Sequence, residues 1–280
     1  MINTQRLWYS FRLQPTLYLG IAVLCLLACI AIAAPWLSQY SPTALNPLAR
    51  MKPPSDAHWF GTDALGRDIF SRVMWGARVS LIVGLAVAVI SVVLGVVIGM
   101  LAGYYKRVDQ IVMRLMDGLM AIPNILLAIA LMAAFKGGLI TVIIAIVIPE
   151  VPRVVRLVRA LVLGIRNQPY VEAAMALGTR TPTILGMHIL PNLFAPLMVQ
   201  ATFIAASAII TEAVLSFLGV GIPPQMPSWG NIMADGRNYL SVAFHIILFP
   251  GIFLAVTVLA VNLVGDGLRD MLDPKLAGKL

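Results

Sequence analysis

Long apolar runs, separated by shorter polar stretches, dominate this sequence. A helix that crosses a lipid bilayer needs about 20 mostly apolar residues. Six segments meet or nearly meet this requirement: residues 17–37, 79–103, 111–134, 139–149, 193–218 and 240–264. Charged residues form only 11% of the chain and apolar residues 60%, whereas soluble domains carry about 25% and about 45–50%. The sequence therefore predicts an all-α membrane protein with six transmembrane helices. It excludes a secreted enzyme, a cytosolic Rossmann-type enzyme and a disordered tail protein.

The distribution of lysine and arginine predicts the orientation of the chain. The first apolar segment is longer than the core of a signal peptide, which is about 7–15 residues, so we expect it to remain as an anchor. With the N-terminus inside, 13 of the 20 basic residues lie on the cytoplasmic side, in keeping with the positive-inside rule. The net charge of +8 then needs no nucleic-acid partner. The predicted organisation is a cytoplasmic N-terminus 1–16, a first transmembrane helix 17–37, an extracytoplasmic loop 38–78, a transmembrane core 79–264 with a cytoplasmic loop 153–191 and an extracytoplasmic loop 219–239, and a cytoplasmic tail 265–280.

The sequence offers no catalytic or metal-binding set of residues. Its three histidines, His58, His188 and His245, have no metal-ligand spacing. The stretch from Gly61 to Asp68 has the spacing of a phosphate-binding loop, but it lacks the lysine and the hydroxyl residue that such a loop needs. We therefore expect no catalytic residue, no metal site and no cofactor on this chain, and any energy from ATP must come through another chain.

A helix–turn–helix is predicted within the cytoplasmic loop. Pro169 suits the first turn of a helix, Glu172 interacts favourably with the positive end of its dipole, and Gly178 permits a sharp exit. Thr181 then begins a second short helix, which Pro191 is expected to stop. Small alanine side chains would let a partner surface approach closely, although an amphipathic connector lying on lipid head groups fits the same pattern.

This inner stretch resembles the coupling motif of bacterial ABC-importer permeases. The pattern is Glu-Ala-Ala, three further residues, a glycine and a terminal Leu-Pro. The matching residues are Glu172, Ala173, Ala174, Gly178, Leu190 and Pro191. In that family the motif fits into a groove on the ATPase subunit, so the resemblance implies an ATPase-docking role here.

Three further stretches are similar to signatures of the dipeptide, oligopeptide and nickel permeases. They lie at His58–Arg78, at Leu215–Gly230 and at Asn262–Pro274, and the long first loop resembles that of the C-type subunit. The two outer stretches imply docking of a binding protein or an outer gate. The residues concerned are Gly61, Thr62, Asp63, Gly66, Arg67, Asp68, Pro227, Ser228, Trp229 and Gly230.

The resemblance implies a type I ABC-importer permease fold in a bacterial inner membrane. It further implies a heterodimer with a second permease, two cytoplasmic ATPases that hold ATP and magnesium, and an extracytoplasmic substrate-binding protein. The expected function is import of di- or oligopeptides by alternating access. Nickel or a metal chelate, glutathione and an opine-like compound remain alternative cargoes.

Several residues within the apolar segments carry separate predictions. Glu212 could line the translocation path, or it could be a structural partner for a polar group on a neighbouring helix. Pro123 is expected to kink the third segment, and Met120 belongs to a methionine stripe that either faces cargo or fills the core. Asp117 is expected to pair with Arg114. Close helix packing is predicted for a stripe of small residues: Gly95, Gly99 and Gly103.

Two other classes of function remain open from the residues. A secondary transporter or channel would predict inverted repeats and broken helices in both halves, and no such pairing is visible. A membrane-embedded enzyme would need a nucleophile and base or a metal set. Either would act without an ATPase partner.

Overall fold

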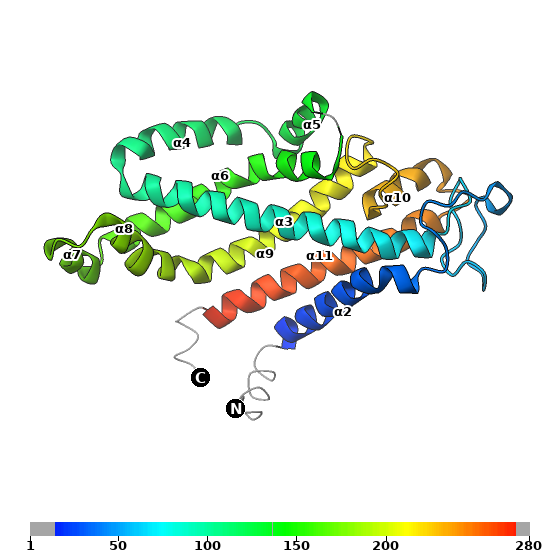
Figure 1. Ribbon diagram of the computed structural model, residues 1–280, viewed down its shortest axis with the longest axis horizontal. Helices are drawn as coiled ribbons and strands as arrows, with labels where there is room; N and C mark the ends of the chain where they lie inside the picture. The colour runs from blue at the N-terminus through cyan, green and yellow to red at the C-terminus, as the bar shows by residue number, and fades with distance from the viewer. Residues whose placement is uncertain (1–14, 136, 273–280) are drawn as a thin grey trace.

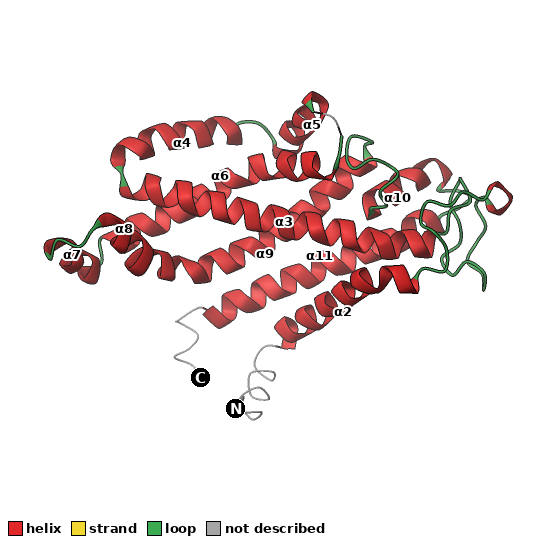
Figure 2. Ribbon diagram, viewed as in Figure 1, coloured by secondary structure: helices red, strands yellow, loops and turns green. Residues whose placement is uncertain are grey.

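The computed structural model describes residues 15–135 and 137–272. Helices account for nearly all of the regular structure in this part of the chain (Figure 2). The helices are α2 (Pro15–Leu37), η1 (Pro47–Ala49), α3 (Ile69–Tyr104), α4 (Lys106–Met120), α5 (Asn124–Ala134), α6 (Leu139–Arg166), α7 (Pro169–Ala176), α8 (Thr181–Thr183), η2 (Ile184–Ile189), α9 (Leu190–Phe217), α10 (Trp229–Gly236), η3 (Arg237–Tyr239) and α11 (His245–Leu272). The predicted tail beyond Leu272, and the basic residues Arg6 and Arg12, lie outside the described residues.

Four helical stretches are long and apolar enough to cross a membrane: α2, α3, the continuous stretch Thr181–Phe217 and α11. The pair α4 and α5 would make a fifth, although it is bent by 89°. Helix α6 has 28 residues, but it carries several charged side chains and is not among these four. The all-α membrane-spanning fold is thus confirmed, and the count of six remains a prediction.

The helix bounds differ from the predicted segments where polar residues continue a helix. Helix α3 begins at Ile69, inside the predicted loop 38–78, because the Asp68 side chain accepts a hydrogen bond from the Ser71 N–H and caps the helix. Helix α11 begins at His245 and ends at Leu272, so part of the predicted tail is helical. The first part of the predicted loop 153–191 is the end of α6.

Three glycines of α3 bring its backbone into contact with three valine side chains of α6. A Cβ atom added to Gly95, Gly99 or Gly103 would lie 2.4, 2.7 and 2.7 Å from the Cβ atoms of Val154, Val158 and Val162, respectively. These six residues are buried. Each glycine therefore leaves room for one valine of α6, which is the arrangement that the four-residue spacing favours.

The long helices run side by side through an elongated bundle (Figure 1). Helix α11 packs against both α2 and α9, and α3 packs against α2, α6 and α9. Small residues again allow close approach, since a Cβ atom on Gly20 would lie 2.8 Å from the backbone oxygen of Ala260. Helix α7 projects at one end of the bundle, and α10 with the segment that precedes α3 forms the opposite end.

Candidate functional site

The first candidate site is α7, a short helix built by the residues that the sequence singled out. Pro169 occupies the first turn and Glu172 follows in it. Gly178 has a φ of +75°, the left-handed region that glycine adopts without a steric cost. Its N–H donates to the Met175 carbonyl at 3.0 Å, and the Thr179 N–H donates to the Ala174 carbonyl at 3.0 Å. This pair of bonds closes the helix as a Schellman motif.

One face of α7 is fixed to the bundle and the other is open. The Val171 side chain is fully buried and Ala174 is also buried. Glu172 and Ala173 are exposed, and 86% of Leu177 is exposed. A Cβ atom added to Gly178 would meet nothing within 4 Å. The exposed face thus offers a carboxylate, small side chains and one large apolar side chain to another surface.

The second helix of the predicted pair does not stop at Pro191. Helix α8 continues through the π-helical turn η2 into α9, and Pro191 lies in the first turn of α9. Proline is tolerated in the first turn of a helix, and the helical stretch runs without a stop from Thr181 to Phe217. Leu190 and Pro191 are exposed at this junction.

At the opposite end, Asp63 organises a buried cluster of charges. Its side chain accepts hydrogen bonds from the backbone N–H groups of Leu65 and Arg67, at 2.8 and 2.9 Å. Asp63 Oδ2 also accepts from Arg67 Nε and from Arg72 Nη1, both at 2.6 Å. Asp63 is fully buried and the two arginines are nearly so, so these ion pairs are shielded from water.

Asp235 of α10 completes this cluster from a distant part of the sequence. Its Oδ2 accepts from Arg67 Nη2 at 2.6 Å and from Arg72 Nη1 at 2.8 Å. Two carboxylates therefore balance two guanidinium groups, and they tie the segment before α3 to α10. Sequence reasoning missed Asp235, which is 168 residues from Arg67. No local pattern in the sequence points to Asp235.

The ten residues predicted to dock a binding protein or form an outer gate are all buried. They are Gly61, Thr62, Asp63, Gly66, Arg67, Asp68, Pro227, Ser228, Trp229 and Gly230. Trp229 is fully buried and donates its indole N–H to the Val73 carbonyl at 3.1 Å. In this structure these ten residues make their contacts within the chain, and the docking or gating role stays a prediction. They hold the segments before α3 and around α10 onto α3 and α9.

Glu212 lies inside the bundle and has no exposed surface. Its carboxylate accepts from Ser216 Oγ at 2.8 Å and from Ser80 Oγ of α3 at 3.4 Å. Ser216 Oγ in turn accepts from the Ile222 N–H at 3.2 Å. The structure therefore shows Glu212 as the partner of hydroxyl groups on α3 and α9. These contacts support the structural alternative, and the role of Glu212 in the translocation path stays a prediction.

The third apolar segment is interrupted where proline was expected to kink it. Pro123 precedes α5 as its cap residue, and α4 and α5 diverge by 89°. Met120 and Pro123 are exposed at this break. The pairing expected between Asp117 and Arg114 is wrong, since Asp117 Oδ1 accepts from Arg156 Nη2 of α6 at 2.5 Å. Asp117 pairs with Arg156 and not with Arg114 because α4 lies along α6. A second ion pair, between Arg159 and Asp109, joins the same two helices.

Within the described residues no group of three or more His, Cys, Asp or Glu side chains could hold a metal ion. The molecule has two different ends, the protruding helix α7 and the bonded cluster around Asp63, which long apolar helices join.

Comparisons with known proteins give the family. The family described as the binding-protein-dependent transport system inner membrane component matches residues 91–278. The N-terminal TM domain of oligopeptide transport permease C matches residues 3–54. The fold is similar to a chain of the MetNI methionine ABC transporter in inward-facing conformations, with a TM-score of 0.54 at 20% identity over 71% of this chain and 97% of that chain.

Curated relatives cover almost the whole chain. A probable peptide ABC transporter permease protein of Sinorhizobium fredii is 54% identical over 98% of this chain and 94% of its own length. The oligopeptide transport system permease protein OppC of Bacillus subtilis is 43% identical over 95% of this chain and 88% of its own. The probable D,D-dipeptide transport system permease protein of Escherichia coli is 40% identical over 99% and 93%. The chain therefore belongs to the family of binding-protein-dependent transport system inner membrane components, as a membrane-spanning ABC-importer permease.

Proposed function

We propose that this chain is one of two permease subunits of an ATP-driven importer of di- or oligopeptides. The cargo is supported by the names of the relatives, which are peptide, oligopeptide and dipeptide permeases at 40–54% identity. In this proposal, a second permease forms a heterodimer with the chain, two ATPases bind ATP and magnesium, and a binding protein delivers cargo from outside. The chain itself holds no cofactor and no catalytic residue.

The observation that carries this proposal is the geometry of α7. The helix projects beyond the long helices at one end of the bundle (Figure 1), and its outer face carries Glu172, Ala173 and the left-handed Gly178. A partner ATPase can therefore bind the exposed face of α7 without first displacing any packed side chain.

The inner face of α7 would pass a movement on to the long helices. Val171 is buried against the bundle, and the Met175 sulfur lies 4.0 Å from the Tyr104 hydroxyl at the end of α3. The Arg166 guanidinium at the end of α6 stacks 5.1 Å from the Tyr104 ring and donates to the Tyr104 carbonyl at 2.9 Å. Closure of the ATPases would thus rotate α3, α6 and α9 together and open the space between the two permeases to the outside. ATP hydrolysis would return the complex to the inward-facing state.

The end with α7 is the cytoplasmic side in this proposal, and both termini are cytoplasmic in a bacterial inner membrane. The segments 38–78 and 219–239 are then extracytoplasmic. Docking of a binding protein would use their exposed side chains, such as Leu48 and Trp59, because the signature residues within them are buried. The other bounds are those of the structure: α6 ends at Arg166 and α11 at Leu272, and the segment 167–180 is cytoplasmic.

The test is ATP-dependent uptake in vesicles that carry the whole complex. Glu172→Arg reverses the charge on the open face of α7, and Gly178→Asp places a side chain on a left-handed residue, so both are expected to abolish uptake or ATPase docking. Gly164→Asp is the matched control, because Gly164 of α6 also has open space around it but lies outside α7. Normal uptake in both α7 variants would overturn the coupling role.

The same vesicles identify the cargo. Di- and oligopeptides are offered beside nickel chelates, glutathione and an opine, which are the alternative cargoes. Uptake of peptides alone supports the proposal, and uptake of a chelate or of an opine in place of peptides would overturn the peptide assignment.

A further inference from the structure

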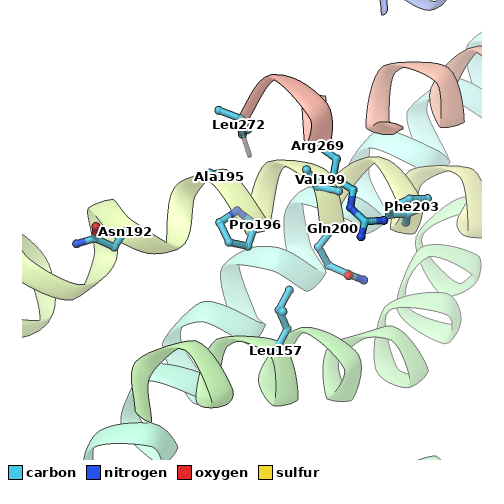
Figure 3. Close-up of a pocket in the computed structure, with 9 residues that line it drawn as sticks. All are labelled: Leu157, Asn192, Ala195, Pro196, Val199, Gln200, Phe203, Arg269 and Leu272. Carbon is cyan, nitrogen blue, oxygen red and sulfur yellow. The ribbon is translucent and has the colours of Figure 1, made fainter. Parts of the chain in front are cut away.

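A groove of about 560 Å³ opens between α6, α9 and α11. Figure 3 shows Gln200 pointing from α9 toward Leu157 of α6, and Arg269 reaching from α11 to the same stretch of α9, beside Phe203. Asn192, near the start of α9, lies at one end of the groove. The volume falls within the range of about 300–1,000 Å³ that small-molecule sites occupy.

Two charged side chains of α6 lie beyond one end of this groove, between α6 and α9. Glu150 Oε1 accepts from Ser207 Oγ of α9 at 3.1 Å, and Arg153 Nη1 lies 3.4 Å from Glu150 Oε2. Arg153 is one helical turn from Leu157, so both lie on one face of α6. Ser207 is likewise one turn from Phe203 on α9. The contact between Glu150 and Ser207 therefore lies beyond the end of the groove that holds Leu157 and Phe203.

This face of α6 lies at a depth where hydrocarbon would surround an isolated helix. Val154, the neighbour of Arg153, packs against Gly95, which lies within the charge-free stretch 79–103 of α3. Nevertheless 47% of the Arg153 side chain is exposed. A half-exposed guanidinium at this depth faces water or another protein chain, because lipid contact would be too costly. The groove that continues from it therefore adjoins water or a partner chain and not lipid.

The walls of the groove match the chemistry of a peptide. Arg269 is the one charged side chain among the described residues that line it, and no carboxylate lines it there. The Gln200 amide can donate to and accept from a peptide backbone. The Asn192 amide oxygen can accept, while its nitrogen donates to the His188 carbonyl at 2.7 Å. Leu157 and Phe203 offer apolar contact that does not depend on the cargo sequence. The α-carboxylate is the one anionic group that every unmodified peptide carries, and a guanidinium binds it with two parallel hydrogen bonds.

We propose that this groove is the inner cargo-binding site of the permease, and that Arg269 binds the α-carboxylate of the peptide there. The inference rests on the proposed peptide import and adds to it a position and a specificity-determining residue. It also predicts that a peptide with an amidated C-terminus is held poorly at this site, whatever its side chains.

The test is protection of an introduced cysteine in the nucleotide-free complex, reconstituted in lipid nanodiscs. Cys25→Ala and Cys29→Ala remove the two exposed native thiols of this chain. Gln200→Cys then places a thiol in the groove, and maleimide labelling of this chain is followed by mass spectrometry. Trialanine and trialanine amide are added directly and titrated to saturation, so that no binding protein is involved. Met198→Cys, on the exposed side of the same helix, is the matched control.

Trialanine is expected to slow the labelling of Gln200→Cys about tenfold at ten times its dissociation constant, and the amide is expected to have little effect. Arg269→Gln should reduce protection by trialanine to that of the amide, and Arg269→Lys should restore part of it. Met198→Cys should label equally in all conditions. Protection that is equal for acid and amide, or absent for both, would overturn the proposal even when vesicles import peptides normally. A Gln200→Cys thiol that labels in detergent but not in nanodiscs would also overturn it, since lipid would then fill the groove.

Discussion

Replacing Gly95 by alanine tests the close packing of α3 on α6. The new methyl carbon would lie 2.4 Å from both Cβ and Cγ1 of Val154, far inside van der Waals contact. Gly95 and Val154 are both buried, and Val154 has only stiff, β-branched bonds with which to move aside. The helices must therefore separate locally.

Two opposing terms set the size of the effect. Overpacking of a dense core costs about 1–3 kcal/mol, while alanine is favoured over glycine within a helix by about 1 kcal/mol. At the short distance of Gly95 the upper part of the first range applies, so the net loss is about 1–2 kcal/mol. For a protein of this size each kcal/mol corresponds to about 2–4 °C in melting temperature, and Gly95→Ala is expected to lower it by about 2–8 °C.

Gly164→Ala is the matched control on α6, because a Cβ atom there meets nothing within 4 Å. Only the helix-propensity term remains, so this variant is expected to raise the melting temperature by about 2–4 °C. The measurement is the loss of the monodisperse complex on heating, followed by fluorescence-detected size-exclusion chromatography. A rise for Gly95→Ala equal to that of Gly164→Ala would refute the packing argument.

Three further predictions concern the charged groups. Asp63→Asn leaves Arg67 and Arg72 buried without a full counter-charge, so thermal unfolding should show a loss of about 3–5 kcal/mol, and hydrogen exchange should rise first in the segment before α3. Glu212→Leu removes the acceptor of two serine hydroxyls and should lower the free energy of unfolding by about 1–3 kcal/mol per unpaired group. Glu212→Gln should keep the rate of uptake per assembled complex. Loss of uptake in a stably assembled Glu212→Gln complex would instead support a role of Glu212 in the translocation path. Asp117→Asn breaks an exposed pair and should change stability by less than about 1 kcal/mol, as the same heating assay would show.

The sequence predicts best those features that depend on local backbone geometry. Gly178 at the end of α7 and the interruption at Pro123 both follow from the backbone preferences of single residues, and the structure shows a left-handed glycine and a broken segment at these places. The angle of 89° does not follow from proline, because it depends on where α4 finds its partners on α6. Proline is also misleading in one place. Pro191 was expected to end a helix, but it stands in the first turn of the next one.

Most of the features that the sequence did not predict are ion pairs between residues far apart along the chain. Arg67 and Asp68 read as polar residues of a long loop, and loops usually lie at the surface. Buried Arg67 pairs with Asp235, and nothing in the local pattern joins two residues so far apart. Likewise Asp117 has a suitable partner in Arg114 by spacing alone, but the fold brings Arg156 closer.

The cluster around Asp63 has a consequence for the synthesis of the chain. Asp63, Arg67 and Arg72 emerge early, whereas the Asp235 carboxylate that completes their charge balance follows more than 160 residues later. Until then the two arginines share one counter-charge, so the half-formed layer stays hydrated and cannot settle onto the helices. Contacts of such long sequence separation form late in folding. The charge cluster near the start of the chain can therefore form fully only after Asp235 has been synthesised. A chain that is truncated before residue 235 would leave this end unfolded and accessible to proteases.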